Sequence, residues 1–236
     1  MPATLQSRLR IILVRPRNPL NIGAAARAMS NFGFSQLRVV NPYEVAFREA
    51  RSAVGASDVL RNAQSFESLS DAIADCSLVI GTTAVAHRTL QHPMVRLDRS
   101  SPLITVDSTH CALLFGSEKI GLSNEDLSYC HLVLNIPTGR ENVSINLGQA
   151  VAVCLYELIR EPADTAVLKQ SEPAIAEELE RLTSVLSDAL LASGYTKRGA
   201  SASTTEKIRR LIRRLTLSSE DAELLLGMLK KISRRQ

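Results

Sequence analysis

The first 160 residues alternate short apolar runs with segments of helical periodicity, and this alternation constrains the fold more than any other feature of the chain. The apolar runs are rich in Leu and β-branched residues with few polar residues between them, which is typical of strands covered on both faces. The expected strands are residues 9–14, 36–40, 78–82, 111–115 and 132–136, with a weaker one at 63–66. The expected helices are residues 22–32, 45–54, 69–75 and 147–160. Strands alternating with helices predict an α/β domain built on a parallel sheet.

A break in the pattern follows this domain. Residues 161–172 show little periodicity and contain Pro162, so we expect a linker there. The chain is therefore divided into a domain of residues 1–160, a linker, and a small helical extension of residues 173–236.

Three amphipathic helices are expected in the extension. Pro173 opens the first and Gly194 ends it. The second, at about residues 204–215, places apolar residues on one face and four arginines on the other. The third begins near Ser218, where Asp221 three residues later completes a capping-box pattern.

The charge of the chain is concentrated in this extension. From residue 197 to the end there are 11 Lys and Arg against 4 Asp and Glu, whereas the remainder has 17 against 20. A basic segment on a slightly acidic body suggests a polyanion partner such as RNA. The candidate phosphate-binding residues are Arg209, Arg210, Arg213 and Arg214. Charge alone leaves a solvated helix face as the alternative.

Several classes of site are missing from the sequence. There is no GxxxxGK(S/T) phosphate loop and no GxGxxG after the first expected strand, which counts against nucleotide hydrolysis and conventional dinucleotide binding. There is no GxSxG nucleophile motif. The four histidines lack metal-ligand spacing, so no metal site is expected. The single, widely spaced cysteines are expected to be buried and reduced; they are Cys76, Cys111, Cys130 and Cys154.

The sequence also lacks a membrane segment. No apolar run approaches the roughly 20 residues that a bilayer-spanning helix needs. Residues 1–10 lead into the first expected strand without the apolar region of a signal peptide. We therefore expect no membrane partner and a cytoplasmic location.

The first motif, VRPRNPLNIGAAARAMSNFG, covers residues 14–33. A strand ends, a Pro-rich turn follows, and a helix opens near Asn21. Gly23 and a run of alanines make this helix slim, so another backbone can approach it closely. Arg27 is its only charged residue, at the carboxyl end of a strand, where ligands bind in open α/β sheets. The alternative is an exposed arginine on a tightly packed helix.

The second motif, LFGSEKIGLSNEDL, covers residues 114–127. Gly116 and Gly121 bracket a loop that leaves a strand, and glycine permits a ligand to approach the backbone. Ser123 with Asp126 has the pattern of a capping box. Glu118 is placed to orient a neighbouring cation, although a plain β-to-α turn with a surface glutamate has the same pattern.

The third motif, IPTGRENVSINLG, covers residues 136–148. Ser144 and Asn146 stand just before the expected helix at Leu147, and both residue types are good helix caps. Short polar side chains at a helix N-terminus are equally suited to contact a ribose or another ligand. Capping alone is the simpler explanation for each of them.

In this order and at these separations, the three motifs resemble the signature motifs of the SpoU branch of the SPOUT RNA methyltransferases. Residues 21–33 match N-x-G-A-A-A-R-A-M-x-N-F-G, and residues 115–125 match F-G-x-E-x-x-G-L-(S/T)-N-E. Residues 136–151 match I-P followed by S-(L/I)-N-L-x-x-A-V. The resemblance implies an S-adenosylmethionine-dependent 2'-O-methyltransferase acting on RNA, with a C-terminal trefoil knot in the α/β domain and a homodimeric assembly.

The resemblance also implies roles for individual residues. The residues expected to hold S-adenosylmethionine are Thr82, Thr83, Ala84, Gly116, Gly121, Ile136, Val143, Ser144 and Leu147. The residues expected in catalysis are Arg27, Asn21, Glu118, Ser144 and Asn146. Arg27 is expected to bind the target phosphate and hydroxyl and to be oriented by Glu118, with the asparagines and Ser144 positioning ribose and cofactor. An arginine cannot easily serve as the base, because its pKa lies above about 12.

The sequence of the extension makes the resemblance specific to one group within the family. Residues 189–195 (ALLASGY), 208–215 (IRRLIRRL) and 225–232 (LLGMLKKI) resemble the helical extension of the TrmJ-like tRNA methyltransferases, which modify the ribose at position 32 of the anticodon loop. Residues 138–142 (TGREN) differ from the Pro- and aromatic-containing loop expected before Ser144. The alternatives are a knotted RNA-binding protein without catalysis, a methyltransferase acting on rRNA, and a Rossmann-type oxidoreductase, which would lack its phosphate-binding glycines.

Overall fold

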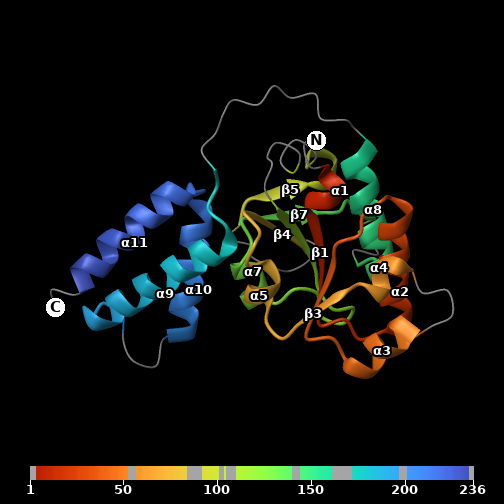
Figure 1. Cartoon of the computed structure of the whole chain (residues 1–236), viewed down its shortest axis with the longest axis horizontal. Helices are drawn as coiled ribbons and strands as arrows, with labels where there is room; N and C mark the ends of the chain where they lie inside the picture. Colours follow the sequence, from red (N-terminus) through yellow and green to blue (C-terminus); the bar gives the residue numbers. More distant parts are fainter. Residues whose placement is uncertain are drawn as a thin grey trace.

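The computed structural model describes residues 4–52, 57–83, 92–100, 104, 110–139, 144–160, 172–196 and 201–233. Within these residues the alternating segments form a seven-stranded sheet with the strand order β3-β2-β1-β6-β4-β7-β5 (Figure 1). Every pair of neighbouring strands is parallel. The strands are β1 (Leu9–Val14), β2 (Leu37–Val40), β3 (Gln64–Phe66), β4 (Leu78–Thr83), β5 (Met94–Arg96), β6 (Cys111–Phe115) and β7 (Leu132–Asn135). The predicted α/β fold with a parallel sheet is confirmed.

The helices follow the predicted order. Those of the domain are α1 (Leu5–Arg8), α2 (Pro19–Asn31), α3 (Glu44–Ser52), α4 (Asp58–Arg61), α5 (Leu69–Ile73), the 3-10 helix η1 (Leu97–Arg99), α7 (Asn124–Ser128) and α8 (Leu147–Arg160). Four short elements of the described residues were not predicted, because three or four residues are too few to show a period; they are α1, α4, η1 and β5. The predicted start of α2 at residue 22 is too late: Pro19 occupies the first turn, and the side chain of Asn18 caps it by accepting the Leu20 N–H.

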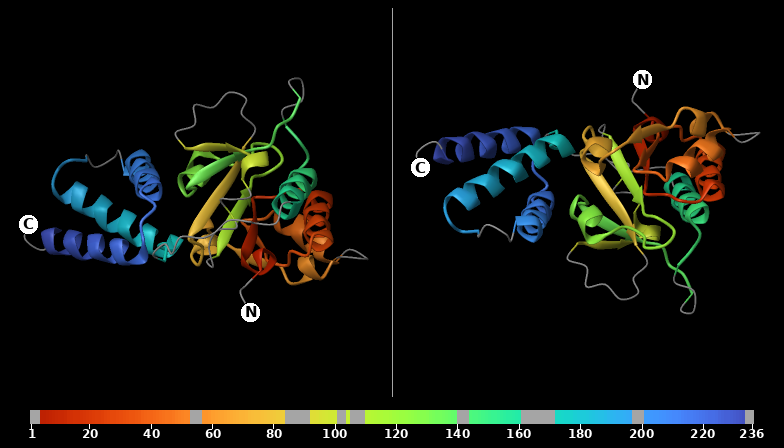
Figure 2. Two further views of the ribbon diagram at one scale, coloured as in Figure 1. Left: turned by 90° about the horizontal axis from the view of Figure 1, so that it is seen from above. Right: turned by 90° about the horizontal axis from the view of Figure 1, so that it is seen from below.

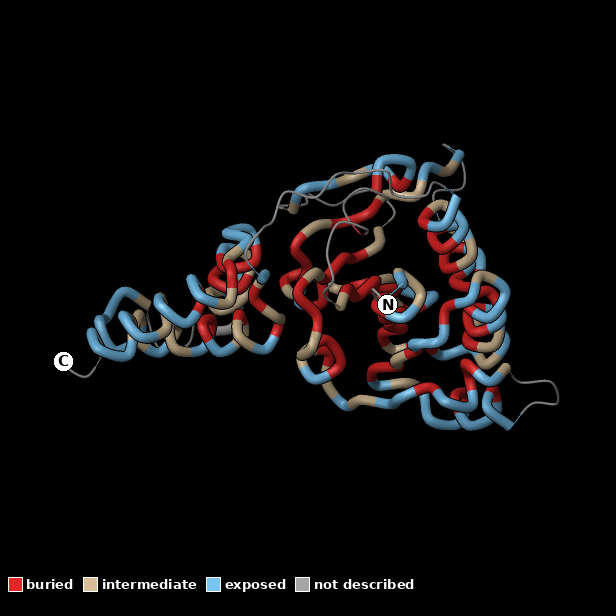
Figure 3. Tube along the Cα trace, turned by 45° about the horizontal axis from the view of Figure 1, so that its top comes forward, coloured by how far each residue is buried: buried red, intermediate tan, exposed pale blue. Residues whose placement is uncertain are grey.

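The central strand β1 faces two apolar cores, one on each side of the sheet. Ile11 and Leu13 pack in the core that contains residues of α2, α3, α4 and α8. Ile12 and Val14 pack in the core that contains residues of α5 and α7. All residues of β1 and β6 are buried, which explains why their sequences show no polar alternation (Figure 3).

Helices α2 and α8 cross at small residues. A Cβ added to Gly148 would lie only 2.6 Å from the Cβ of Ala24, which is closer than real side chains approach. The prediction that another backbone approaches the slim helix of the first motif is therefore confirmed. The crossing sets the first turns of the two helices side by side, which matters for the site described below.

The extension contains α9 (Ala176–Ala192), α10 (Ser201–Arg214) and α11 (Ser219–Ser233). These helices lie together at one side of the sheet domain (Figures 1 and 2). They share a separate apolar core formed by Ala174, Leu179, Leu182, Ile208, Ile212 and Ala222. The predicted caps are present: Ser218 accepts the Asp221 N–H, and Gly194 follows α9 with φ +76°.

The extension is joined to the domain through the start of α9. The backbone N–H of Ala176 donates to the Cys76 oxygen at 2.6 Å, and that of Glu177 donates to the Ala74 oxygen at 3.1 Å. These bonds satisfy donors at a helix N-terminus, which have no partner within the helix. Ala176 is also part of the domain core beside α5.

The prediction that the α10 arginines form a solvent-facing basic surface is wrong for two of them. Only 8% of Arg209 and 1% of Arg213 is exposed. Arg210 is partly buried and pairs with Glu206 at 3.0 Å, whereas Arg214 is exposed. Helical periodicity separates an apolar face from a charged face, but it does not show that a second surface covers the charged face.

All four cysteines are buried and no disulfide joins them, as predicted. Burial raises the pKa of Cys154 to about 12. Among the described helices, none has the length and apolar character needed to cross a membrane.

Asp75, in the turn after α5, contacts several basic side chains. Its carboxylate accepts hydrogen bonds from Arg38 at 3.0 Å and from Arg10 at 3.4 Å, and it lies 3.1 Å from Nδ1 of His110. Burial opposes ionisation, but the hydrogen bond and charge of Arg38 hold the pKa of Asp75 well below its ordinary value. Arg38 belongs to β2 and Arg10 to β1, so this carboxylate ties two strands to the turn.

Asp75→Asn should lower the thermal unfolding midpoint at pH 7, and this difference should shrink as the pH falls below about 4. A carboxylate whose pKa is depressed in the folded state stabilises that state only above its unfolded pKa, and the stabilisation is lost as protons bind. Unfolding midpoints of both chains between pH 3 and 7 would test this. The exposed Asp188→Asn is the control, and a midpoint difference for Asp75→Asn that is independent of pH would contradict the prediction.

Candidate functional site

A cavity of about 310 Å³ lies at the carboxyl ends of β4, β6 and β7. Seven of the nine residues predicted to hold the cofactor line it: Thr82, Thr83, Gly116, Gly121, Ile136, Ser144 and Leu147. The other two, Ala84 and Val143, lie outside the described residues. Ligands bind at this edge of open parallel sheets, where the strand order changes direction.

The loop after β6 forms one wall of the cavity. A Cβ on Gly116 would lie 1.9 Å from the carbonyl carbon of Gly121, so only glycine fits there. The Gly121 N–H donates to the Ser117 oxygen at 2.8 Å, and Gly121 itself has φ +66°, a conformation that favours glycine. The two glycines of the second motif therefore shape the cavity wall.

The loop continues into α7 through the predicted capping box. Ser123 Oγ accepts the Asp126 N–H at 3.1 Å, and the Ser123 N–H donates to the Asp126 carboxylate at 2.6 Å. The same carboxylate pairs with Arg15, which follows β1 with φ +53°. This ion pair was not predicted, because the two residues are 111 positions apart in the chain.

A chain of hydrogen bonds joins the three motifs beside the cavity. Asn146 Nδ2 donates to Asn21 Oδ1 at 2.7 Å, and Asn21 Nδ2 donates to Glu118 Oε1 at 3.1 Å. Asn146 Oδ1 also accepts the Gly148 N–H at 2.9 Å, so Asn146 caps α8 as well. Glu118 lines the cavity. Each motif thus supplies one member of a connected polar group.

Glu118 has a different partner from the one predicted. Its carboxylate accepts the backbone N–H groups of Arg17 at 3.2 Å and Asn18 at 3.3 Å, in addition to the Asn21 amide. A carboxylate at the positive end of α2 is favourably placed. Glu118 therefore orients Asn21 and the start of α2, and it makes no contact with Arg27 within this chain.

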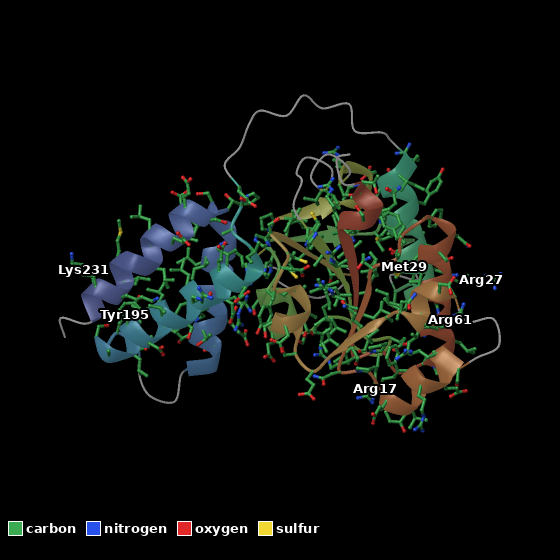
Figure 4. The ribbon with its side chains drawn as sticks, viewed as in Figure 1. Arg17, Arg27, Met29, Arg61, Tyr195 and Lys231 are labelled. Carbon is green, nitrogen blue, oxygen red and sulfur yellow. The ribbon has the colours of Figure 1, made fainter. Side chains whose placement is uncertain are left out.

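Arg27 lies apart from the cavity. It is six residues beyond Asn21, which corresponds to about 9 Å along the helix. Its side chain is exposed, and it forms no hydrogen bond or ion pair with any residue in the described ranges. Figure 4 shows Arg27 on the outer side of α2, at the edge of the molecule. The structure brings Asn21, Glu118, Ser144 and Asn146 together but leaves Arg27 outside the group.

The histidines and acidic residues in the described part of the chain show no metal-binding arrangement. Among the described residues, no group of three or more His, Cys, Asp or Glu side chains could hold a metal ion. His131 is buried, and its Nδ1 accepts the Val79 N–H at 3.0 Å. Burial lowers the pKa of His131 to about 3, so the ring is neutral at physiological pH.

Comparisons with known proteins agree with the motifs. The SpoU rRNA Methylase family model matches residues 8–156. The tRNA (cytidine/uridine-2'-O-)-methyltransferase TrmJ of Sodalis glossinidius is 36% identical over 236 residues, which cover 97% of this chain and 92% of the relative. TrmJ of Citrobacter koseri is 37% identical over 237 residues, covering 96% and 97%. Among solved structures, TrmJ from Z. mobilis ZM4 has a TM-score of 0.83 and 32% identity, covering 94% of this chain and 98% of that chain.

Asn21→Asp should destabilise the fold at pH 7 and have less effect near pH 4. The replacement removes the Nδ2 donor and places a second carboxylate against Glu118, and exposed charge pairs contribute up to about 1 kcal/mol. The pH dependence follows because protonation of either carboxyl group relieves the repulsion. Chemical denaturation at both pH values would measure it. Asn21→Ala is the control: it loses the same bond to Glu118, and also the bond from Asn146, without adding charge. If the loss of stability for Asn21→Asp depends on pH no more than that for Asn21→Ala, there is no repulsion.

Proposed function

Because the chain belongs to the SpoU rRNA Methylase family, we propose that it transfers a methyl group from S-adenosylmethionine to a ribose 2'-hydroxyl of tRNA, at position 32 of the anticodon loop. The observation that carries this proposal is the hydrogen-bonded group of Glu118, Asn21 and Asn146 beside the cavity. The named TrmJ relatives, similar over nearly the whole length of the chain, support tRNA as the substrate.

The cavity fits S-adenosylmethionine. Its lining includes apolar side chains suited to an adenine ring, such as Ile120, Leu122 and Leu147, and hydroxyl groups suited to polar parts of the cofactor, such as Thr82 and Thr83. Glycine at position 116 keeps the loop backbone close to the cavity. When bound, the cofactor supplies an electrophilic methyl group on a sulfonium, which is a good leaving group.

The residues of the chain contribute mainly by positioning. Asn146 Nδ2 donates to Asn21 Oδ1 at 2.7 Å. Asn21 Nδ2 in turn donates to the Glu118 carboxylate, which fixes the orientation of the Asn21 amide. Amides held in this way donate and accept hydrogen bonds in fixed directions, so they orient a ribose entering beside Ser144. Correct alignment of the attacking oxygen accounts for a large part of the rate gain in such transfers.

The proposed active enzyme is a homodimer in which Arg27 of the partner subunit completes each site. Arg27 lies exposed on the outer side of α2 and forms no hydrogen bond or ion pair with the described residues of its own chain, and α2 and α8 carry exposed apolar side chains. On α8, Val153, Tyr156 and Ile159 are 44%, 53% and 38% exposed. A second copy placed over this face would cover them. Arg27 would then donate N–H groups to the target phosphate and to the 2'-oxygen, which would stabilise that oxygen as its proton passes to solvent water.

Further parts of the proposal rest on the family. We propose that the α/β domain is knotted through the segments around residues 116–122, 136–138 and 144–147, which contribute residues to one cavity. We also keep the division into a domain of residues 1–160, a linker of residues 161–172 and an extension of residues 173–236. Of the basic residues predicted to contact RNA, the exposed Arg214 and the partly buried Arg210 remain candidates. A tRNA substrate places the enzyme in the cytoplasm.

Arg27→Ala should lower kcat by about 100-fold or more at saturating RNA, because a positioned proton-handling or charge-stabilising group contributes on this scale. Single-turnover methylation with purified tRNA would measure the loss. Arg48→Ala, which removes another exposed arginine of the domain, is the control and should keep the wild-type rate. A near-normal rate for Arg27→Ala would refute the role of Arg27.

The dimer predicts complementation between two inactive variants. Thr83→Trp, which fills the cavity, and Arg27→Ala should each be inactive alone. A doubly tagged heterodimer of the two has one intact cavity facing one intact Arg27, so it should recover about half of the wild-type activity. If Arg27 instead acts on the cavity of its own chain, the heterodimer stays inactive.

The reaction itself is tested by incubating the purified protein with methyl-labelled S-adenosylmethionine and, in parallel samples, unmodified tRNA or unmodified rRNA. Nuclease digestion and mass spectrometry then locate the label. Label on the ribose at position 32 is the expected result. Label on rRNA alone would move the substrate to the rRNA alternative, and cofactor binding without any methyl transfer would favour an RNA-binding protein without catalysis.

A further inference from the structure

Helix α7 links the cavity wall to the extension. The loop of residues 116–122 ends where α7 begins, so the position of α7 fixes the end of the loop. This helix has only five residues, which is too short to be stable by itself. The position of α7 in the fold therefore depends on its contacts with residues outside the helix.

One end of α7 is held by the sheet domain. Asp126 in its first turn is buried, with 4% exposed, and closes the capping box with Ser123. Its carboxylate pairs with Arg15 at the end of β1. The start of α7 is thus tied to the same strand end that leads into the first motif.

The other end of α7 is held by the extension. Ser128, its last residue, accepts a hydrogen bond at 3.0 Å from Nη1 of Arg209 on α10. The remaining guanidinium donors of Arg209, Nε and Nη2, each lie 2.9 Å from the carboxylate of Glu180 on α9. The guanidinium carbon lies 4.0 Å from the centre of the Tyr129 ring, just after α7. One arginine therefore contacts α7, the residue after it, and a second helix of the extension.

The contacts of Arg209 with Ser128, Tyr129 and Glu180 form a joint between α7 and the extension. Arg209 is buried within this joint and is not exposed to a ligand. Its side chain is 9% exposed, and all three of its nitrogens have partners. Arg210, the next residue, reaches α7 at its first residue through the Asn124 oxygen at 3.5 Å. The extension thus contacts α7 at both ends. A planar guanidinium with a fixed set of donors suits such a joint better than a lysine would.

We propose that Arg209 is a positioning residue for the cavity: by holding α7 against Glu180, it keeps the loop of residues 116–122 in the shape that binds S-adenosylmethionine. The extension then has a role in cofactor binding in addition to any contact with RNA. This inference rests on the proposed function, because it takes the cavity to be the S-adenosylmethionine site.

Four variants of the full-length protein test it. Arg209→Ala removes the joint, and Arg209→Lys keeps the charge without the planar set of donors. Ser128→Ala removes the bond from Arg209 to α7, together with the bond that the Ser128 hydroxyl donates to the Glu125 oxygen at 2.6 Å. It leaves the pairing of Arg209 with Glu180 in place, so the extension stays docked. Arg181→Ala is the matched control: it removes an arginine of the same extension whose side chain is 58% exposed and pairs with Glu177 at 3.4 Å.

Two measurements separate positioning from general stability at a temperature where thermal melts show all variants folded. Calorimetry should give a dissociation constant for S-adenosylmethionine about tenfold higher for Arg209→Ala, with smaller increases for Arg209→Lys and Ser128→Ala. Hydrogen exchange without cofactor should be faster in peptides covering residues 116–128 of Arg209→Ala and Ser128→Ala. Arg181→Ala should match the wild type in both, and tRNA affinity should change less than about twofold in all four.

Other results overturn the inference. If Arg209→Ala weakens tRNA binding while cofactor affinity and exchange at residues 116–128 stay unchanged, Arg209 serves RNA binding instead. If no variant differs from Arg181→Ala in cofactor affinity or in hydrogen exchange, the position of α7 does not depend on the extension. A wild-type protein that binds no S-adenosylmethionine refutes the proposed function, while the exchange comparison still tests whether Arg209 holds the loop.

Discussion

The backbone of Gly116 passes so close to Gly121 and Leu122 that no side chain fits between them. The cavity depends on this contact, because it folds the loop back on itself directly after β6. Glu118 lies at the tip of the folded loop, where its carboxylate accepts two backbone N–H groups at the start of α2. The loop therefore fixes the relation between the second motif and the first. Through Asn21 and Asn146 the same relation extends to α8.

Most of the charged groups near the site form contacts with other groups of the protein. Helix N-termini commonly bind ligand anions, but the start of α2 binds the carboxylate of Glu118. In the extension, Arg209 and Arg213 are occupied by contacts with Glu180, the Ser128 hydroxyl and a backbone oxygen. The excess of basic residues after position 197 therefore overstates the positive charge that the extension presents to an RNA.

Much of the fold could be predicted from the sequence, because the parallel strands are buried on both faces. The five strong strands were placed to within one residue at each end, since runs such as β1 and β6 have no exposed positions to interrupt them. The three-residue β5 has two exposed residues out of three and lacks this signal. The cavity lining could be predicted only through the family motifs, because its residues come from loops that periodicity does not describe.

The joint of the extension could not be predicted in this way. Arg209 and Glu180 are 29 residues apart, and Arg209 and Ser128 are 81 residues apart. A single sequence does not show which distant charges meet. The same limit explains the partner of Glu118: an acidic side chain in a loop was expected to face a basic one, but backbone N–H groups and an asparagine satisfy it.

The burial of the cysteines has a practical consequence. Cys76, Cys111, Cys130 and Cys154 lie in the two cores of the domain, and burial raises the thiol pKa of three of them far above physiological pH. Only a thiolate reacts readily with alkylating reagents, so these thiols react when the core opens and not before. The rate of their alkylation therefore reports how often the domain opens. A cysteine introduced at the surface would, in contrast, be labelled selectively without removing any of the native four.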